Sequence, residues 1–289
     1  MTIAACYLSP EGVVFGSDST TTVASSSSDE HYFDFGQKIF ELGEAATLGI
    51  VSWGLGGIQH TSYRTLYAEF ADDLSSNPPA SVEEAAKRWA AKFYSVYDSA
   101  VGAAYRAAEA AAHTPEDKAA VEDNCDRIAV GFCLGGIALP NRRPGAFELE
   151  FRPDGTTIPE PIQLPMGLAV FRGVPMLINR MLYGIDLELF DKIVASPLWS
   201  GGGDKLAELV QPFLLGQPAM LPLRDAIDWI YACIYSTIKG LKFSPLPPIC
   251  GGPVEVAVVT TDRPFRWVKH KNLDAAVVDV AGGTHQDAT

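Results

Sequence analysis

The sequence predicts an α+β protein in which two antiparallel sheets pack face to face with helices outside each sheet, a four-layer αββα sandwich. Strand-like segments come before any helix, and the order then runs helix pair, strands, helix pair, strands. Strands that come in blocks favour antiparallel sheets over βαβ units. Because 47% of the 289 residues are apolar, the chain has enough apolar side chains for a packed core.

The first elements are four strands, expected over residues 2–8, 13–16, 38–42 and 46–53. The turn Ser9-Pro10-Glu11-Gly12 predicts a β-hairpin between the first two strands, because Pro and Gly suit a reversal of the chain. A polar stretch rich in Ser and Thr, residues 19–30, separates the second strand from the third. Four strands in a row argue against a βαβ start.

The helices of the first pair are expected over residues 57–74 and from Ser81 to about residue 113. Ser81 and Glu84 form a capping box, in which hydroxyl and carboxylate satisfy free N–H groups at a helix start. Apolar residues at helical spacing follow, giving one buried face: Ala85, Trp89, Phe93, Val96 and Tyr97. Further strands are predicted over residues 128–138, 147–151 and 168–171, then helices over 176–193 and 223–239, then strands over 254–260 and 265–268.

The domain organisation is predicted to be one domain over residues 1–289. The Pro- and Gly-rich segment around 196–222 is interpreted as a surface insertion between the last two helices. The tail after residue 283 is expected to be frayed.

The composition excludes several partners. A net charge of -13 opposes binding to nucleic acid and to anionic membrane surfaces. The five cysteines sit mostly in apolar runs, as buried free thiols do, which suits the cytoplasm. The start MTIAACYLSPEG lacks the basic region of a signal peptide. The five dispersed histidines show no zinc-ligand spacing, and the glycines after Trp53 lack the third small residue of a dinucleotide loop, so we expect no metal and no cofactor.

Thr2 becomes the N-terminal residue when Met1 is removed. A Thr hydroxyl is a poor nucleophile until a base takes its proton, and the nearest base is the α-amine of the same residue. A free α-amine has a pKa of about 7.7–8.0, which is close to the pH of the cytoplasm. A nearby lysine ammonium would lower this pKa further, and a carboxylate beside the lysine would hold the lysine in place.

Three other residues fit such a site. Asp18 ends the second predicted strand and Lys38 opens the third, so an antiparallel sheet would bring both near the N-terminus. Gly54 directly follows the fourth strand, where its backbone N–H would stabilise an oxyanion. Taken singly, Thr2 is uninformative, and Asp18 with Lys38 is equally consistent with a surface ion pair of little weight. The order of all four favours catalysis.

Several stretches resemble the proteasome β-subunit family, including its bacterial heat-shock member. TIAACYLSPEGVVFGSDS is similar to the start of a mature β-subunit: N-terminal Thr, strand, turn with Gly, strand, then Asp-Ser. Lys38-Ile-Phe-Glu-Leu42 resembles the family motif around its catalytic lysine, and residues 48–57 resemble the strand that ends in the oxyanion-hole glycine. Cys250-Gly251-Gly252 looks like the Gly-Gly turn before a late strand.

The resemblance implies an N-terminal-nucleophile (Ntn) hydrolase fold and a threonine-type endopeptidase or amidohydrolase. Thr2 would be nucleophile and base, Asp18 and Lys38 the supporting pair, and Gly54 the oxyanion donor. The substrate would be a peptide or another amide. Because members of the family confine their sites inside rings, a homo-oligomer is implied as well. Nothing in the sequence identifies an unfoldase partner.

This sequence departs from the family pattern at two places. The auxiliary aspartate of the family falls on Pro247-Pro248, and its partner serine falls on Cys250. The Gly-Ser-Gly segment corresponds to residues 172–174 by element order, but Trp199-Ser-Gly-Gly202 is more similar by letters. An alternative function is therefore a catalytically silent, proteasome-like scaffold subunit.

Overall fold

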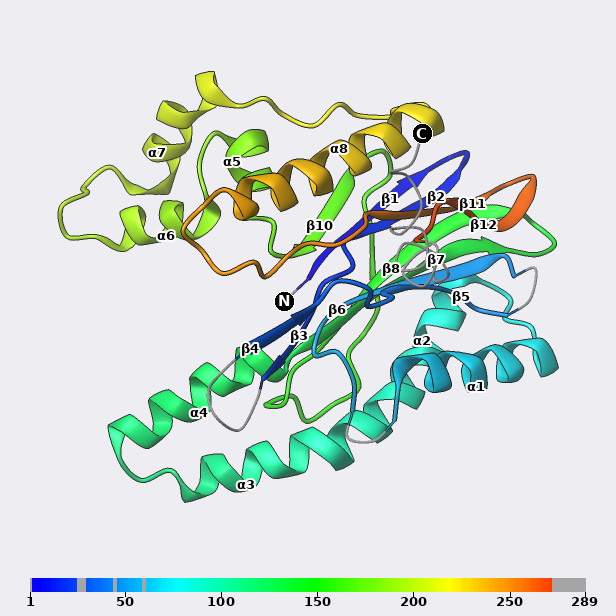
Figure 1. Ribbon diagram of the computed structural model, residues 1–289, viewed down its shortest axis with the longest axis horizontal. Coiled ribbons are helices and arrows are strands. Elements are labelled where there is room, and N and C mark those ends of the chain that lie inside the picture. The colour runs from blue at the N-terminus through cyan, green and yellow to red at the C-terminus, as the bar shows by residue number, and fades with distance from the viewer. Residues whose placement is uncertain (1, 25–29, 44–45, 59–60, 272–289) are drawn as a thin grey trace, which may run out of the picture.

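The computed structural model describes residues 2–24, 30–43, 46–58 and 61–271, and contains antiparallel sheets with helices (Figure 1). One five-stranded sheet has the order β10-β1-β2-β11-β12. Its strands are β1 (Ile3–Ser9), β2 (Gly12–Ser17), β10 (Ala169–Gly173), β11 (Glu255–Thr260) and β12 (Arg263–Lys269). A second five-stranded sheet has the order β5-β6-β7-β8-β9, and β3 pairs with β4 as a separate hairpin. The strands outside the first sheet are β3 (Thr21–Ala24), β4 (Glu30–Phe33), β5 (Ile39–Glu41), β6 (Leu48–Gly54), β7 (Val130–Ala138), β8 (Arg143–Phe151) and β9 (Ile162–Gln163).

Helices cover each five-stranded sheet. The helices are α1 (Tyr63–Ser76), α2 (Val82–Tyr97), α3 (Ala103–Ala111), α4 (Pro115–Ile128), α5 (Met176–Tyr183), α6 (Leu187–Ala195), α7 (Gly202–Val210) and α8 (Leu223–Lys242). Apolar side chains of α1 and α2 share one buried cluster with β6, β7 and β8. Those of α5 and α8 share another with β1, β2, β10 and β11. The third cluster draws on both sheets, with Phe15 from β2 and Val51 from β6, and lies between them.

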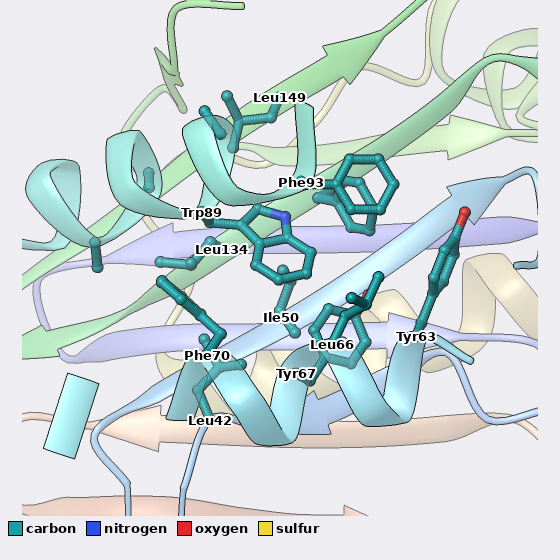
Figure 2. Packing of buried hydrophobic residues seen from close by; sticks show 14 of the residues in the cluster. Leu42, Ile50, Tyr63, Leu66, Tyr67, Phe70, Trp89, Phe93, Leu134 and Leu149 are labelled. Carbon is teal, nitrogen blue, oxygen red and sulfur yellow. The ribbon is translucent and has the colours of Figure 1, made fainter. Parts of the chain in front are cut away.

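Aromatic rings fill the cluster under α1 and α2 (Figure 2). Trp89 on α2 is fully buried, and its ring centroid lies 5.1 Å from that of Tyr67 and 5.3 Å from that of Phe132. Phe93, one turn further along α2, lies 4.6 Å from Phe132. The apolar stripe expected on this helix is therefore its buried face, and it attaches α2 to the second sheet.

The start of α2 is capped by Ser81, as predicted. The Ser81 hydroxyl accepts a hydrogen bond of 3.0 Å from the Glu84 N–H, while the Glu84 carboxylate accepts from the Ala80 N–H at 2.8 Å. Both partners of the capping box thus satisfy backbone donors, although Glu84 reaches one residue further back than usual. The helical path continues through a π-helical turn, Asp98–Gly102, into α3 and ends at Ala111, close to the predicted end.

The first helix starts later than predicted. Residues 57–62 precede it, and α1 begins at Tyr63 because the Ser62 hydroxyl accepts from the Thr65 N–H at 3.2 Å and caps the helix there.

Some predicted elements are wrong in number or extent. The single helix expected over 176–193 is two helices, α5 and α6, because Gly184 ends α5 in a left-handed conformation (φ 68°). The polar stretch 19–30 holds β3 and the start of β4, and the segment 196–222 holds α7. The predicted frayed tail lies outside the described residues.

Helix α4 was not predicted, although its start carries a clear signal. The Thr114 hydroxyl accepts from the Asp117 N–H at 3.1 Å, and the Asp117 carboxylate accepts from the Thr114 N–H at 3.2 Å. Pro115 occupies the first turn, where its missing N–H costs nothing. This complete capping box could have been read from the sequence Thr114-Pro-Glu-Asp117.

Candidate active site

Thr2 directly precedes β1, a strand that lies between β10 and β2 in the first sheet. Its side chain is buried and lines a cavity of about 60 Å³. The other residues around this cavity come from the β3 hairpin and from β5, β6 and their flanks: Thr21, Thr22, Gln37, Lys38, Ser52, Trp53, Gly54, Leu55 and Gly56. Two of the three other predicted site residues, Lys38 and Gly54, therefore share one cavity with Thr2.

Asp18 is held at the end of β2 by backbone groups on both sides. Its Oδ1 accepts a hydrogen bond of 3.0 Å from the Ile3 N–H, the residue after Thr2. Its Oδ2 accepts from the N–H groups of Thr20, at 3.2 Å, and Gly251, at 3.1 Å. The side chain is fully buried. Hydrogen bonds to a charged acceptor are among the strong ones, so this carboxylate has a fixed place.

Lys38 pairs with Asp18 in the interior. The Lys38 Nζ lies 2.5 Å from Asp18 Oδ1, and the two side chains are 8% and 0% exposed. The backbone is fixed as well, because the Lys38 carbonyl accepts a hydrogen bond of 3.0 Å from the Ser52 N–H of β6. A buried ion pair is strongly coupled, since the loss of one partner leaves the other charge uncompensated.

Gly54 ends β6 with a φ of 84°, a conformation that side chains disfavour. A Cβ atom at this position would lie 2.3 Å from the carbonyl oxygen of Ala129. Residue 54 must therefore be glycine for the backbone to turn here against the start of β7. The turn keeps the backbone of Gly54 at the wall of the cavity that Thr2 lines.

Gly173 lies against Thr2 and belongs to one of the two segments that resemble the Gly-Ser-Gly segment of the family. It ends β10 opposite Ile3 of β1, and a Cβ on it would lie 1.8 Å from the Thr2 carbonyl oxygen. The segment 199–202, which is more similar to the family motif by letters, precedes α7, and the Trp199 indole N–H donates to the Gly202 carbonyl at 2.9 Å. Of the two candidate segments, the one that contains Gly173 lies beside Thr2.

Cys250 and Gly251 lie beside Asp18, in the turn before β11. Burial raises the pKa of the Cys250 thiol to about 12, and the negative charge of Asp18 acts in the same direction. The thiol is therefore protonated at neutral pH. The group of this turn that supports the site is the Gly251 N–H, which donates a hydrogen bond to the Asp18 carboxylate. Sequence reasoning missed that bond, because it joins residues 233 positions apart.

Within the part of the chain that the structure describes, no group of three or more His, Cys, Asp or Glu side chains could hold a metal ion. Nor is any helix of the described ranges long and apolar enough to cross a membrane.

Comparisons with known proteins identify similar structures. No protein-family model matches the chain, and no curated protein matches its sequence. A solved structure of an Anbu (Gly-1) mutant from Hyphomicrobium sp. strain MC1 matches 100% of both chains at 12% identity, with a TM-score of 0.50. Anbu from Yersinia bercovieri, described as an ancestral β-subunit, matches 97% of this chain and 93% of its own at 15% identity, with a TM-score of 0.48. The likeness to the Hyphomicrobium protein over the whole chain shows that the two proteins share a fold.

Proposed function

We propose that this chain is a threonine-type Ntn hydrolase that cleaves peptide or other amide bonds with Thr2 after removal of Met1. The observation that carries the proposal is the shared cavity of Thr2, Lys38 and Gly54, together with the buried ion pair of Lys38 and Asp18. A buried lysine held by a carboxylate beside a residue-2 hydroxyl is the arrangement that an N-terminal nucleophile needs.

The reaction would run in two steps. The α-amine of Thr2 takes the hydroxyl proton, and the Thr2 oxygen attacks the amide carbonyl carbon. An ester forms, the C–N bond breaks, and the α-ammonium returns the proton to the leaving amine. A water molecule then attacks the ester, the α-amine takes its proton, and the acid is released with the Thr2 hydroxyl restored.

The neighbours of Thr2 would assist both steps. The ammonium of Lys38 would favour the neutral, basic form of the α-amine, because two cations close together disfavour each other. Asp18 holds that ammonium in place and compensates its charge. The backbone N–H of Gly54 would stabilise the oxyanion that develops on the substrate carbonyl. The roles are those that the resemblance to proteasome β-subunits implies.

The finer fold and the assembly belong to the same proposal. We propose that the packing of α1 and α2 on one sheet and of α5 and α8 on the other is the four-layer αββα sandwich of Ntn hydrolases, with residues 1–289 as one domain. We also propose that the protein is a cytoplasmic homo-oligomer and that its substrates are peptides or other amides. Light scattering should give a mass well above the 31.0 kDa of one chain; a monomer would contradict this part.

The decisive experiment concerns the free amine of Thr2. Mass spectrometry of the intact protein should show that Met1 is absent. A peptide epoxyketone, which reacts with a hydroxyl and an amine on the same residue, should label the wild type at Thr2. Thr2→Ser should keep labelling and hydrolysis of a peptide library, because it keeps both groups. Thr2→Ala should be inert, and so should a folded protein with residues that cannot be trimmed ahead of Thr2. Equal hydrolysis by the blocked protein would refute the mechanism.

A catalytically silent scaffold is the second candidate. It is favoured by the buried thiol of Cys250, which stands where the family has its auxiliary serine and which is protonated at neutral pH. A scaffold would assemble to the same mass but would not react with the epoxyketone, even with a free Thr2 amine.

A further inference from the structure

A second buried ion pair lies outside the site described so far. The Lys271 Nζ lies 2.7 Å from Glu255 Oε2, and the two side chains are 1% and 0% exposed. The other carboxylate oxygen, Oε1, lies 2.7 Å from Nδ1 of His270. The His270 ring in turn stacks on Trp267, with 4.0 Å between the ring centroids. Both oxygens of Glu255 thus lie within ion-pair distance of the residues that follow β12, although among the described residues neither oxygen accepts a hydrogen bond of normal geometry.

This pair is adjacent to the candidate active site in the sheet. Glu255 opens β11 and lies opposite Ser17 of β2, the residue before Asp18. Ser17 is in turn opposite Ala4 of β1, two residues after Thr2. Glu255, Ser17 and Ala4 therefore form a row across three neighbouring strands, β11, β2 and β1 (Figure 1), and this row lies next to Asp18 and two residues from Thr2 in the sequence.

The ammonium of Lys271 also contacts the two segments that carry Asp18 and Lys38. It donates a hydrogen bond of 3.3 Å to the Ser19 hydroxyl and one of 3.0 Å to the Gly36 carbonyl. Ser19 follows Asp18, and Gly36 stands two residues before Lys38. The segments are joined directly as well, because the Gly36 N–H donates to the Ser19 carbonyl at 2.8 Å. One ammonium thus ties together the backbone on both sides of the Asp18–Lys38 pair.

The energy of this arrangement points to a role in positioning. Burial lowers the pKa of Lys271, and the contact with Glu255 offsets this effect only in part. Taking two charges out of water is costly, and an apolar pair of similar volume is often as stable or more stable. The gain that distinguishes Lys271 from an apolar side chain is its directed hydrogen bonds to Ser19 and Gly36.

We propose that Lys271, held by Glu255, is a positioning residue that fixes the Asp18–Lys38 pair relative to Thr2. The inference rests on the proposed function of Thr2. Lys271 is not itself a catalytic residue. It acts through Ser19, which follows Asp18, and through Gly36, which stands two residues before Lys38. Without it, the Lys38 ammonium would shift from the α-amine of Thr2, and the pKa of that amine would rise.

The test uses variants that avoid an isolated buried charge. Lys271→Met alone leaves Glu255 uncompensated, so the main variant is the double substitution Glu255→Gln/Lys271→Met, which removes both charges. Lys271→Arg keeps the cation and its donors and serves as the conservative variant. Lys269→Met is the matched control, because it removes a positive charge two residues away that bonds the Tyr231 hydroxyl instead.

The first readout is the rate at which a peptide epoxyketone labels Thr2, measured against pH. In the double variant we expect the rate at neutral pH to fall by about 10- to 100-fold, the effect of a small misplacement. Half of the maximal rate should be reached at higher pH, which a general loss of stability would not cause. Lys271→Arg should recover most of the rate, and Lys269→Met should stay within about twofold of the wild type. A folded double variant that matches the wild type in rate and pH profile would overturn the inference.

The second readout needs no activity and separates this inference from the proposed function. Amide hydrogen exchange should become faster in the double variant at Ile3, Thr20 and Gly251, whose N–H groups bond to Asp18. Exchange in the buried half of α8 should stay unchanged. If the wild type does not react with the probe, the proposed function fails while this readout still decides the positioning role. Unchanged exchange at all three amides would exclude the positioning role of Lys271.

Discussion

The backbone of Gly173 lies so close to Thr2 that a Cβ atom on residue 173 would stand 1.8 Å from the Thr2 carbonyl oxygen. Gly173 also has a φ of 85°, a conformation that costs other residues about 1–3 kcal/mol. We therefore expect Gly173→Ala to displace Thr2 and to lower both the free energy of unfolding and the rate of labelling at Thr2. Urea denaturation and the epoxyketone reaction measure the two effects.

The control for this substitution is Gly203→Ala in α7, where the nearest atom to the new Cβ, on Phe190, would be 4.0 Å away. Alanine is the better helix former, so this variant should be at least as stable as the wild type. Normal labelling by a folded Gly173→Ala protein would contradict the close approach at Thr2.

Gly54 and Gly56 line the same cavity but differ in their surroundings, which makes them a matched pair. A Cβ on Gly54 would lie 2.3 Å from the Ala129 carbonyl oxygen, whereas one on Gly56 would meet only the Thr21 methyl group at 3.8 Å. Alanine keeps the N–H of residue 54, but its Cβ forces the backbone to move, so we expect Gly54→Ala to lose about 100- to 1,000-fold in rate, as a site without its oxyanion donor does. Gly56→Ala should remain active. Steady-state hydrolysis of a peptide library would show the difference, and equal rates would remove Gly54 from the mechanism.

Lys38→Met should abolish hydrolysis and also destabilise the protein, because Asp18 would remain as a buried carboxylate without its cation. The expected loss in the free energy of unfolding is about 3–5 kcal/mol. Three backbone N–H groups still bond to Asp18, which should keep the loss at the lower end. The stability is measured by urea denaturation.

Lys192→Met is the control for that loss, because its partner Glu188 is exposed on the same helix and such pairs contribute about 0.3–0.5 kcal/mol. Asp18→Asn/Lys38→Met should recover stability but not activity. If the double variant is active, the ion pair has no catalytic role.

The thiol of Cys250 should be inert in the folded protein. With a pKa of about 12 it is about one part in 10,000 thiolate at pH 8, and the thiolate is the reactive form. An aromatic disulfide reagent should therefore react with Cys250 far more slowly in native protein than in urea, where all five cysteines become accessible. Cys250→Ala should keep the labelling of Thr2. Fast reaction of the native thiol at pH 8 would disprove the assigned protonation state.

The parts of the site that depend on local pairing could be predicted from the sequence. The hairpin of β1 and β2 was recognisable from its turn, and its register brings the Asp18 carboxylate to the Ile3 N–H. Lys38 and Gly54 could be assigned because each borders a strand that its own apolar pattern reveals. Likewise, the Ser81 cap and the aromatic stripe of α2 are local signals, and both occur where the pattern indicated.

The remaining parts depend on contacts between distant segments, which no local pattern specifies. Gly173 and Gly251 reach Thr2 and Asp18 only through the pairing of β10 with β1 and of β11 with β2. In the sequence, Glu255 and Lys271 look like ordinary charged residues near a strand. Their burial depends on the contact between the end of β12 and the segment at Ser19. Chain direction and strand order would have to be known before any of these residues could be assigned.

The pairing of β2 with both β1 and β11 has a consequence for how the protein is made. β1 and β2 are within reach of each other as soon as they leave the ribosome, but β11 begins at residue 255. At about 5–20 residues per second, the later strand arrives on the order of ten to fifty seconds after the first. Because Asp18 obtains the Gly251 N–H only then, the nascent chain carries an exposed Thr2 without its assembled surroundings. If Thr2 is the nucleophile proposed above, Met1 would be removed before the supporting residues are in place, and the site would become active only when synthesis is nearly complete.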